Sequence, residues 1–250
     1  MSDAAHQLSE GTPPAPSSPP APPAPRGALR RRGARLSRWA LVVLGGYYVV
    51  CVALLAVYRF VAPPLTGVQL ERRLEAALAG TPYAERKRFV PLARIPKHVV
   101  HAVVAAEDGR FWSHWGFDLG QMRDAGVDAL KGEGLRGAST IDQQLVKNLF
   151  GCTCRNPVRK LYDYALTPPA VLILGKERIL ELYLNEVEWG PGVFGVDAAA
   201  RHHYGTGARG LSRAQAAGLA ALLPNPLERS PGNTAEYRGQ ILDRMSFRGW

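Results

Sequence analysis

Residues 107–118 read EDGRFWSHWGFD, so acids, a histidine and aromatic side chains follow one another closely. The apolar residues just before them recur at helical spacing, which predicts a helix over residues 96–108 with Glu107 at its end. A carboxylate near aromatic walls is a candidate for a raised pKa, because desolvation penalises its charged form and suits it to acid–base chemistry. Composition alone favours a structural cluster, in which Asp108, His114 and Asp118 hold the turn.

Residues 137–148 read GASTIDQQLVKN and predict a second helix. Ser139 is the expected N-cap, with Asp142 as a weaker form of the capping-box acid. Polar side chains converge on one face of this helix by three- and four-residue spacing: Gln143, Gln144, Lys147 and Asn148. Such a face is either exposed to solvent or the wall of a binding site.

Basic residues continue beyond this helix, at Lys147, Arg155, Arg159 and Lys160. Fixed Arg and Lys donors beside a carboxylate suit a phosphorylated substrate whose leaving group develops negative charge. By composition alone, a solvated basic face is the commoner explanation.

The rest of the main domain predicts helices. Residues 176–189 are amphipathic, and residues 196–204 are rich in alanine. Ser212 and Gln215 form a capping-box signature that opens a further helix. No convincing alternating strand pattern is present, so the fold is predicted to be mainly α.

The N-terminal part of the chain predicts a membrane anchor. Residues 1–38 are rich first in proline and then in arginine, and we expect a disordered cytoplasmic tail. Residues 39–61 hold an uncharged run long enough to cross a bilayer as one transmembrane helix. Residues 62–94 are expected to be a linker and membrane-proximal segment with a short helix near residues 70–79. The main domain is then residues 95–250.

The orientation of the anchor follows from its flanking charges. An arginine cluster without acids precedes the span, so the positive-inside rule keeps the N-terminus in the cytoplasm and exports everything after Arg59. A cleaved signal peptide is disfavoured, because its apolar core is usually only about 7 to 15 residues long and starts close to the N-terminus. A nucleic-acid partner is not expected, because the basic cluster abuts an apolar span.

Cys152 and Cys154 form a C-x-C pair in the exported region. A disulfide is chemically permitted there but closes a very tight loop, and free or transiently oxidised thiols are at least as compatible with the sequence. The chain's 3 cysteines lack histidine pairs at ligand spacing, so no metal site is predicted.

Four stretches together carry a resemblance to a known family. Residues 107–118 are similar throughout to the E-D-x-x-F-x-x-H-x-G-x-D motif of the family-51 glycosyltransferases, the peptidoglycan polymerases. Residues 137–148 look like their G-x-S-T-I-x-Q-Q-x-x-K-N motif. Residues 159–163 resemble the third motif, R-K-x-x-E, and residues 179–185 resemble the fourth. The segment 190–205 continues in the style of the monofunctional members.

The resemblance implies a lysozyme-like helical domain with a small membrane-proximal lobe, preceded by one transmembrane helix. The implied activity is polymerisation of lipid II into β-1,4 glycan chains with release of undecaprenyl pyrophosphate. Glu107 would take the proton from the acceptor sugar's 4-hydroxyl as that oxygen attacks the donor's anomeric carbon, and a single displacement would invert the configuration. A carboxylate base facing a cationic leaving-group site is what glycosyl transfer from a diphosphate requires.

Site residues carried over from the family fall into three groups. The catalytic residues would be Glu107 and Asp163. The substrate-binding residues would be Ser139, Thr140, Gln143, Gln144, Lys147, Asn148, Arg155, Arg159 and Lys160, with the last three holding the donor pyrophosphate. The residues that shape the first motif would be Asp108, Phe111, His114, Gly116 and Asp118.

Cofactors, partners and location are also implied. No cofactor is required, although Mg²⁺ or Mn²⁺ at the pyrophosphate is possible without a dedicated ligand set. The partners would be lipid II, the growing glycan chain, the membrane and other cell-wall synthesis proteins. The protein would be a single-pass protein of the bacterial inner membrane with its catalytic domain in the periplasm. The sequence lacks S-x-x-K and K-T-G, so no transpeptidase activity is expected.

The segment 161–175 departs from the family pattern. Asp163 stands where the third motif has Glu, so its reach is one methylene shorter. Pro168 and Pro169 fall where the family continues a helix, and an interior proline removes a donor and clashes with the preceding turn. Val171 stands where relatives commonly have an acid.

Two other functions stay open at this point. The divergent segment is compatible with a catalytically impaired, membrane-anchored protein kept for its contacts with other cell-wall proteins. A glycan-cleaving lysozyme-like enzyme would share the fold and use a Glu as acid, but it needs neither a cation cluster nor an anchor.

Overall fold

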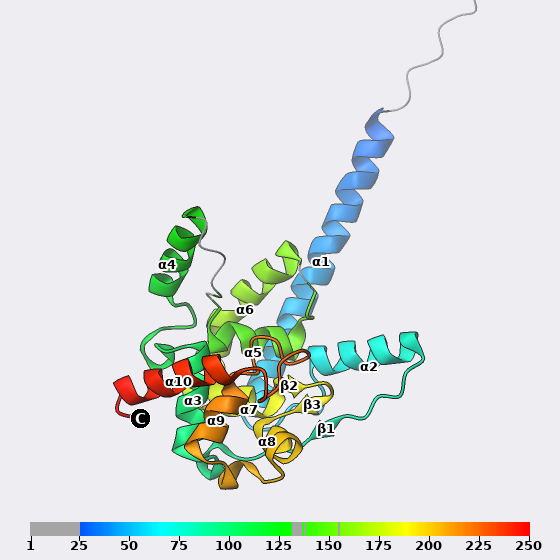
Figure 1. Ribbon diagram of the computed structural model, residues 1–250. Helices are drawn as coiled ribbons and strands as arrows, with labels where there is room; N and C mark the ends of the chain where they lie inside the picture. The colour runs from blue at the N-terminus through cyan, green and yellow to red at the C-terminus, as the bar shows by residue number, and fades with distance from the viewer. Residues whose placement is uncertain (1–25, 132–136, 138, 155) are drawn as a thin grey trace, which may run out of the picture. The chain divides into compact units, whose positions relative to one another are not determined.

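The computed structural model describes residues 26–131, 137, 139–154 and 156–250 (Figure 1), so Arg155 and residues 1–25 of the predicted disordered tail lie outside the described part. The helices and strands, in chain order, are α1 (Arg26–Tyr58), α2 (Gly67–Ala79), β1 (Arg86–Lys87), η1 (Leu92–Arg94), α3 (Lys97–Glu107), η2 (Phe111–Ser113), α4 (Leu119–Leu130), α5 (Ile141–Phe150), α6 (Pro157–Leu174), α7 (Lys176–Glu186), β2 (Glu188–Gly190), β3 (Val193–Phe194), α8 (Val196–Tyr204), η3 (Ala208–Gly210), α9 (Arg213–Ala220) and α10 (Ala235–Phe247). The mainly α prediction is confirmed.

The chain divides into two compact units, Met1–Gly45 and Gly46–Trp250. Helix α1 contains a candidate membrane span, Leu41–Tyr58, with a mean hydropathy of 2.3. The apolar helix predicted within residues 39–61 is therefore present, and it ends at Tyr58. It begins at Arg26, so the expectation of disorder is wrong for residues 26–38, which continue the same helix. By its length and composition it fits a membrane anchor. The predicted domain boundaries at residues 61 and 94 stay predictions.

The core of the Gly46–Trp250 unit is built by helices. Helix α3 packs against α9 and α10, and α5 packs against α6 and α7 (Figure 1). The side chains of Phe111, Ile141, Leu145 and Leu180 are among those fully buried between them. Each such side chain contributes about 1.5 to 3 kcal/mol by leaving water, so one shared core stabilises the helices that carry the first and second motifs.

The N-terminus of α5 differs from the sequence prediction by one residue. Its N-cap is Thr140, whose Oγ1 accepts the Gln143 N–H at 3.3 Å while Gln143 Oε1 accepts the Thr140 N–H at 3.2 Å. The prediction of Ser139 as N-cap is wrong, because Gln143 completes a full capping box with Thr140 and not with Ser139. The capping box predicted at Ser212 and Gln215 is confirmed.

Helix α2 is longer than the sequence indicated. It begins at Gly67 after a capping box of Thr66 and Gln69 and packs against α5. A Cβ on Gly67 would lie 2.3 Å from the carbonyl oxygen of Gly151, so only glycine permits this approach of the two segments.

A small sheet with strand order β1-β3-β2 was not predicted. Strand β1 pairs with β3 in parallel, and β2 pairs with β3 antiparallel. Strands of two or three residues are too short to produce an alternating pattern in the sequence. The helix predicted up to Trp189 therefore ends at Glu186, because Glu188–Gly190 joins this sheet.

Helix α6 runs through Pro168 and Pro169 without a break. A proline lacks the N–H that would bond the carbonyl four residues earlier, which for Pro169 is Ala165. The Tyr48 hydroxyl of α1 donates to the Ala165 carbonyl oxygen at 3.3 Å and so replaces the missing donor. The helix therefore continues through both prolines, and a contact from a distant helix compensates one of the two lost bonds.

Candidate active site

Glu107 is the last residue of α3, and its half-buried carboxylate faces α5. The Glu107 Oε2 atom accepts a hydrogen bond from Gln144 Nε2 at 2.8 Å, and Gln144 Oε1 accepts one from the Tyr183 hydroxyl at 2.9 Å. The amide of Gln144 is therefore oriented from both ends. A relay from α7 through α5 holds one carboxylate oxygen of Glu107, while Oε1 is not part of this relay.

The loop after α3 is fastened to the N-terminus of α5. Asp108 is the C-cap of α3, and its Oδ2 accepts the Ile141 N–H at 3.1 Å and His114 Nε2 at 3.0 Å. The Thr140 hydroxyl donates to the Gly116 carbonyl oxygen at 2.7 Å. These bonds join the first two motifs, so they set the position of Glu107 against Gln144.

The other motif positions within residues 107–118 stabilise the conformation of this loop. Gly116 has a φ of +92°, and a Cβ there would lie 2.7 Å from Thr167 Cγ2 on α6, so a side chain is excluded. Asp118 accepts two hydrogen bonds from the Arg110 guanidinium and one from the Gln121 N–H at 2.9 Å. Phe111 is fully buried.

The surroundings of Glu107 shift its pKa in opposing directions. Burial raises the pKa of the Glu107 carboxyl above its ordinary value, while the Gln144 hydrogen bond and the positive charges of Lys147 and Arg229 lower it in part. The net direction is upward, because desolvation is the largest contribution. A carboxylate of raised pKa is a stronger base than an exposed one and suits proton abstraction from a hydroxyl.

Cations gather on the far side of α5, where α6 begins. Arg159 Nη1 donates to Asp163 Oδ2 at 2.6 Å, and Arg159 Nε donates to the Cys154 carbonyl oxygen at 2.9 Å. Lys160 Nζ donates to Ser139 Oγ at 2.8 Å and lies 5.0 Å from the centre of the Tyr164 ring. The shorter side chain of Asp163 therefore does reach a cation, the guanidinium four residues before it.

Lys147 connects the two sides of the site. Burial lowers the pKa of its ammonium group, the nearby Arg159 lowers it further, and the charges of Asp163 and Glu107 oppose both effects. Burial likewise raises the pKa of the Asp163 carboxyl against the effect of the three surrounding cations. One ammonium thus acts electrostatically on both acids that the sequence marks as catalytic.

The structure brings together most of the residues predicted for the site. Glu107, Ser139, Gln144, Lys147, Arg159, Lys160 and Asp163 belong to this connected set. Thr140 Oγ1 and Gln143 Oε1 accept the hydrogen bonds of the α5 cap, whereas the buried Gln143 Nε2 has no hydrogen-bond partner among the described residues. Asn148 Nδ2 donates to the Gln144 carbonyl oxygen at 2.7 Å. Substrate contact by these three residues stays a prediction. Arg155 lies outside the described residues.

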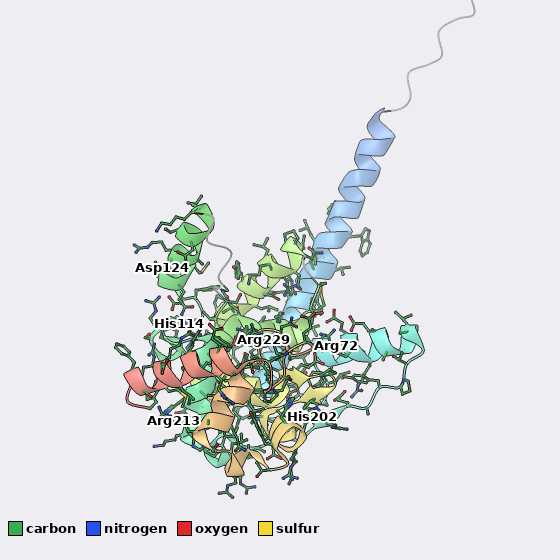
Figure 2. The ribbon with its side chains drawn as sticks, viewed as in Figure 1. Arg72, His114, Asp124, His202, Arg213 and Arg229 are labelled. Atoms are coloured by element: carbon green, nitrogen blue, oxygen red, sulfur yellow. A yellow bond between two sulfur atoms is a disulfide. The ribbon has the colours of Figure 1, made fainter. Side chains whose placement is uncertain are left out.

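Sequence reasoning missed two residues near Glu107 and one beside Asp108. Tyr183 orients Gln144, and it lies within the stretch 179–185 that resembles the fourth motif, which is the signal that could have found it. Arg229 lies in the loop after α9 (Figure 2), and its positive charge lowers the pKa of Glu107. Lys176 contacts Asp142 beside Asp108, and no pattern in the sequence pairs these residues.

A cavity of about 550 Å³ lies beside the first motif, lined by Arg110, Ser113, His114, Trp115, Phe117, Asp118 and Leu119. Glu107 and Gln144 are not among its lining residues, so we do not place the acceptor sugar there. The C-x-C pair follows the C-terminal end of α5, the end away from Thr140. Cys152 and Cys154 form a disulfide, and Thr153 between them is bonded to the Glu71 carboxylate on α2.

Comparisons with known proteins agree on one family. A family profile described as Transglycosylase matches residues 74–246. The biosynthetic peptidoglycan transglycosylase of Ectopseudomonas mendocina (strain ymp) is 43% identical over 202 residues, which cover 81% of this chain and 84% of the relative. Proteins of the same name from Pseudomonas putida (strain KT2440) and Chromohalobacter salexigens are 43% and 44% identical over 219 residues, covering 86% of this chain and 91% and 92% of the relatives.

Proposed function

The chain belongs to the transglycosylase family and is a peptidoglycan glycosyltransferase acting on lipid II and the glycan chain, and from this premise we propose that Glu107 is its general base. Two observations support this role: Gln144 Nε2 donates a hydrogen bond to the Glu107 carboxylate at 2.8 Å, and burial raises the pKa of that carboxyl. One oxygen is fixed by the relay from Tyr183, which leaves the other to accept a proton from the acceptor.

The proposed reaction is a single displacement. The acceptor sugar's 4-hydroxyl gives its proton to Glu107 while its oxygen attacks the anomeric carbon of the donor. The bond from that carbon to the pyrophosphate oxygen breaks, and the electron pair leaves with undecaprenyl pyrophosphate. Because attack and departure occur on opposite faces, the configuration at the anomeric carbon is inverted. General-base catalysis of this kind is worth about 10²- to 10⁴-fold in rate.

We assign the leaving group to the cations around Asp163. Lys147, Arg159 and Lys160 act together on the Asp163 carboxyl, so they are close enough to share one anion. Fixed positive charges stabilise a pyrophosphate as it develops charge in the transition state. In this proposal Asp163 holds the Arg159 guanidinium in place at 2.6 Å and so acts through it.

We propose that the reaction requires no resident metal. Asp163 is the carboxylate at the leaving-group site, and its Oδ2 is already bonded to Arg159. The neighbouring side chains are cations, so this donor set does not fit Mg²⁺ or Mn²⁺, which prefer several oxygen ligands. Such an ion could still arrive on the pyrophosphate itself, and polymerisation assays with EDTA and with added Mn²⁺ measure that contribution.

We also propose the location of the protein. Helix α1 would anchor the chain in the bacterial inner membrane, with its basic N-terminus in the cytoplasm and the glycosyltransferase domain in the periplasm. Exposed apolar side chains on α4 and on the first half of α6 support contact of these two helices with the bilayer: Leu119, Leu130, Val158 and Leu161. The anchor would keep the site beside its lipid-borne substrate and beside other cell-wall synthesis proteins.

The test is polymerisation of labelled lipid II by the full-length protein in detergent. Glu107→Gln keeps the size of the side chain and removes the base, so we expect glycan synthesis to fall by at least about 10²-fold while the unfolding temperature barely changes. Glu236→Gln, at an exposed position on α10, is the matched control and should keep full activity. Equal product from wild type and Glu107→Gln would exclude Glu107 as the base.

The same preparation separates the other two functions. A lysozyme-like enzyme would release soluble fragments from finished peptidoglycan, which a polymerase does not. A catalytically impaired interaction protein would give no glycan from lipid II even as wild type.

A further inference from the structure

A buried group of charged side chains begins at Asp108, the residue after Glu107. Its centre is Lys176 at the start of α7. Lys176 Nζ lies 2.9 and 2.7 Å from the two carboxylate oxygens of Asp142 and 3.5 Å from His114 Nδ1. It also lies 4.3 Å from the centre of the Phe111 ring. His114 Nε2 in turn lies 3.0 Å from Asp108 Oδ2.

The ligand atoms around this ammonium have the arrangement of a cation site. One ligand atom each from Asp108, His114 and Asp142 all lie within 4.8 Å of one another. The side chains of Asp108 and Asp142 are 0% exposed, and that of His114 is 9% exposed. Two carboxylates and an imidazole are a donor set that binds divalent transition metals. Here the positive charge is supplied by a lysine of the chain.

The hydrogen bonds of His114 indicate which ring nitrogen donates and which accepts. The Gly116 N–H donates to His114 Nδ1 at 3.2 Å, so this nitrogen is an acceptor and the proton resides on Nε2, facing Asp108. Nδ1 is also the ring nitrogen nearer Asp142, at 3.8 Å from its Oδ2, so His114 donates no hydrogen bond to that carboxylate. The ammonium of Lys176 is therefore the counter-charge within bonding distance of Asp142 in this cluster.

We propose that Lys176 is a positioning residue for the reaction, in which its ammonium takes the place of a divalent metal ion in the Asp108–His114–Asp142 cluster and fixes Glu107 against Gln144. Asp108 is the residue after Glu107, and Asp142 lies in the first turn of α5, two residues before Gln144. A change in the separation of these carboxylates moves the base relative to its hydrogen-bond partner. This inference rests on the proposed role of Glu107.

The experiment replaces the lysine and offers a metal. Lys176→Ala leaves Asp142 buried without its counter-ion, so we expect Tm to fall by about 10 °C and lipid II polymerisation to fall at least about tenfold. Added Zn²⁺ should then occupy the vacated position, raise Tm by about 5 °C and restore part of the polymerisation. Zn²⁺ should raise neither quantity for the wild type, where Lys176 occupies the site.

Two controls show whether any rescue belongs to this cluster. Lys87 is a matched lysine, because its side chain is 18% exposed and paired with the fully buried Glu186, against 17% for Lys176 with the fully buried Asp142. Lys87→Ala should also lower Tm, and Zn²⁺ should not raise it, because no histidine of the described residues completes a ligand set there. The pair Lys176→Ala with His114→Ala should lose the response to Zn²⁺.

A further variant covers the case in which Lys176→Ala does not fold. Lys176→Met with Asp142→Asn removes both charges but keeps the side-chain volumes, so it should fold at nearly the wild-type Tm. A double variant as unstable as Lys176→Ala would show that Lys176 acts by packing and would overturn the proposal. So would a Lys176→Ala variant whose Tm does not respond to Zn²⁺. These unfolding readouts do not use catalysis, so they stand apart from the Glu107→Gln test.

Discussion

Two regions of the molecule are stabilised in different ways: the junction between the end of α3 and the start of α5, and the helix α6. At the junction, residues of the two motifs bond one another directly: Asp108 accepts the Ile141 N–H at 3.1 Å, and Thr140 donates to the Gly116 carbonyl oxygen at 2.7 Å. In α6, local preferences oppose the helix at Pro168 and Pro169. A hydroxyl from Tyr48, far away in the sequence, supplies a bond that the helix lacks.

Divergence from a motif therefore does not by itself indicate a lost function. Asp163 is shorter than the acid it replaces, yet Arg159 is on the same helix at a spacing of four residues and closes the distance. The junction is therefore expected to tolerate little change, whereas α6 is expected to tolerate more because its contacts come from several elements.

The largest expected effect breaks the junction. Asp108→Ala removes the acceptor of the buried Ile141 N–H and of His114 Nε2. Leaving buried donors unpaired costs about 1 to 3 kcal/mol each, and a small displacement of Glu107 costs about 10²-fold in rate. We expect a lower free energy of unfolding in urea and a slower polymerisation of lipid II. Asp243→Ala, at an exposed site on α10, should change neither; the same result for Asp108→Ala would contradict the description of the junction.

The next prediction concerns the acid of α6. Asp163→Asn releases the Arg159 guanidinium from its 2.6 Å contact, so we expect polymerisation to fall about tenfold, equivalent to about 1.4 kcal/mol. Asp163→Glu should keep most of the activity, because a glutamate four residues after Arg159 can form the same ion pair. A loss as large as that of Glu107→Gln would instead indicate a direct catalytic role for Asp163.

The pH dependence of the rate sharpens the link between the two regions. Glu107 must be deprotonated to act as base, and burial raises its pKa, so activity should decline on acidification at a higher pH than the ordinary value of a glutamate suggests. Lys147 lowers the pKa of Glu107, so Lys147→Met should move this acidic limb to still higher pH. The pH profile of kcat/KM measures it, and a shift to lower pH would contradict the electrostatic contact between the two residues.

The smallest effect tests the compensation in α6. Tyr48→Phe removes the donor to the Ala165 carbonyl oxygen and should cost about 0.5 to 1.5 kcal/mol of unfolding free energy. In a Pro169→Ala background the new backbone N–H can bond the same carbonyl, so Tyr48→Phe should cost less there. A double-mutant cycle by thermal unfolding in detergent measures this coupling. Strict additivity would show that Tyr48 does not replace the missing bond.

Periodicity and charge are local properties, so the sequence alone predicted the helical class of the fold, the apolar helix near the N-terminus and the end of α3 at Glu107. The residues of the candidate site came from the resemblance of the motifs to a known family. It could not place the N-cap of α5, since Ser139 and Thr140 are both good capping residues and the choice depends on Gln143. It also missed the strands β2 and β3, which are too short to leave a pattern.

Contacts between residues far apart in the sequence could not be predicted from local patterns. Tyr183 reaches Gln144 across 39 residues, Lys176 reaches Asp142 across 34, and Tyr48 reaches Ala165 across 117. Such pairs form because helix packing brings side chains from separate elements into one buried volume, where an unpaired polar group is costly. The proposed base is thus visible in the sequence, whereas Gln144 and Tyr183, which hold it in position, are brought together by the packing of α5 against α7.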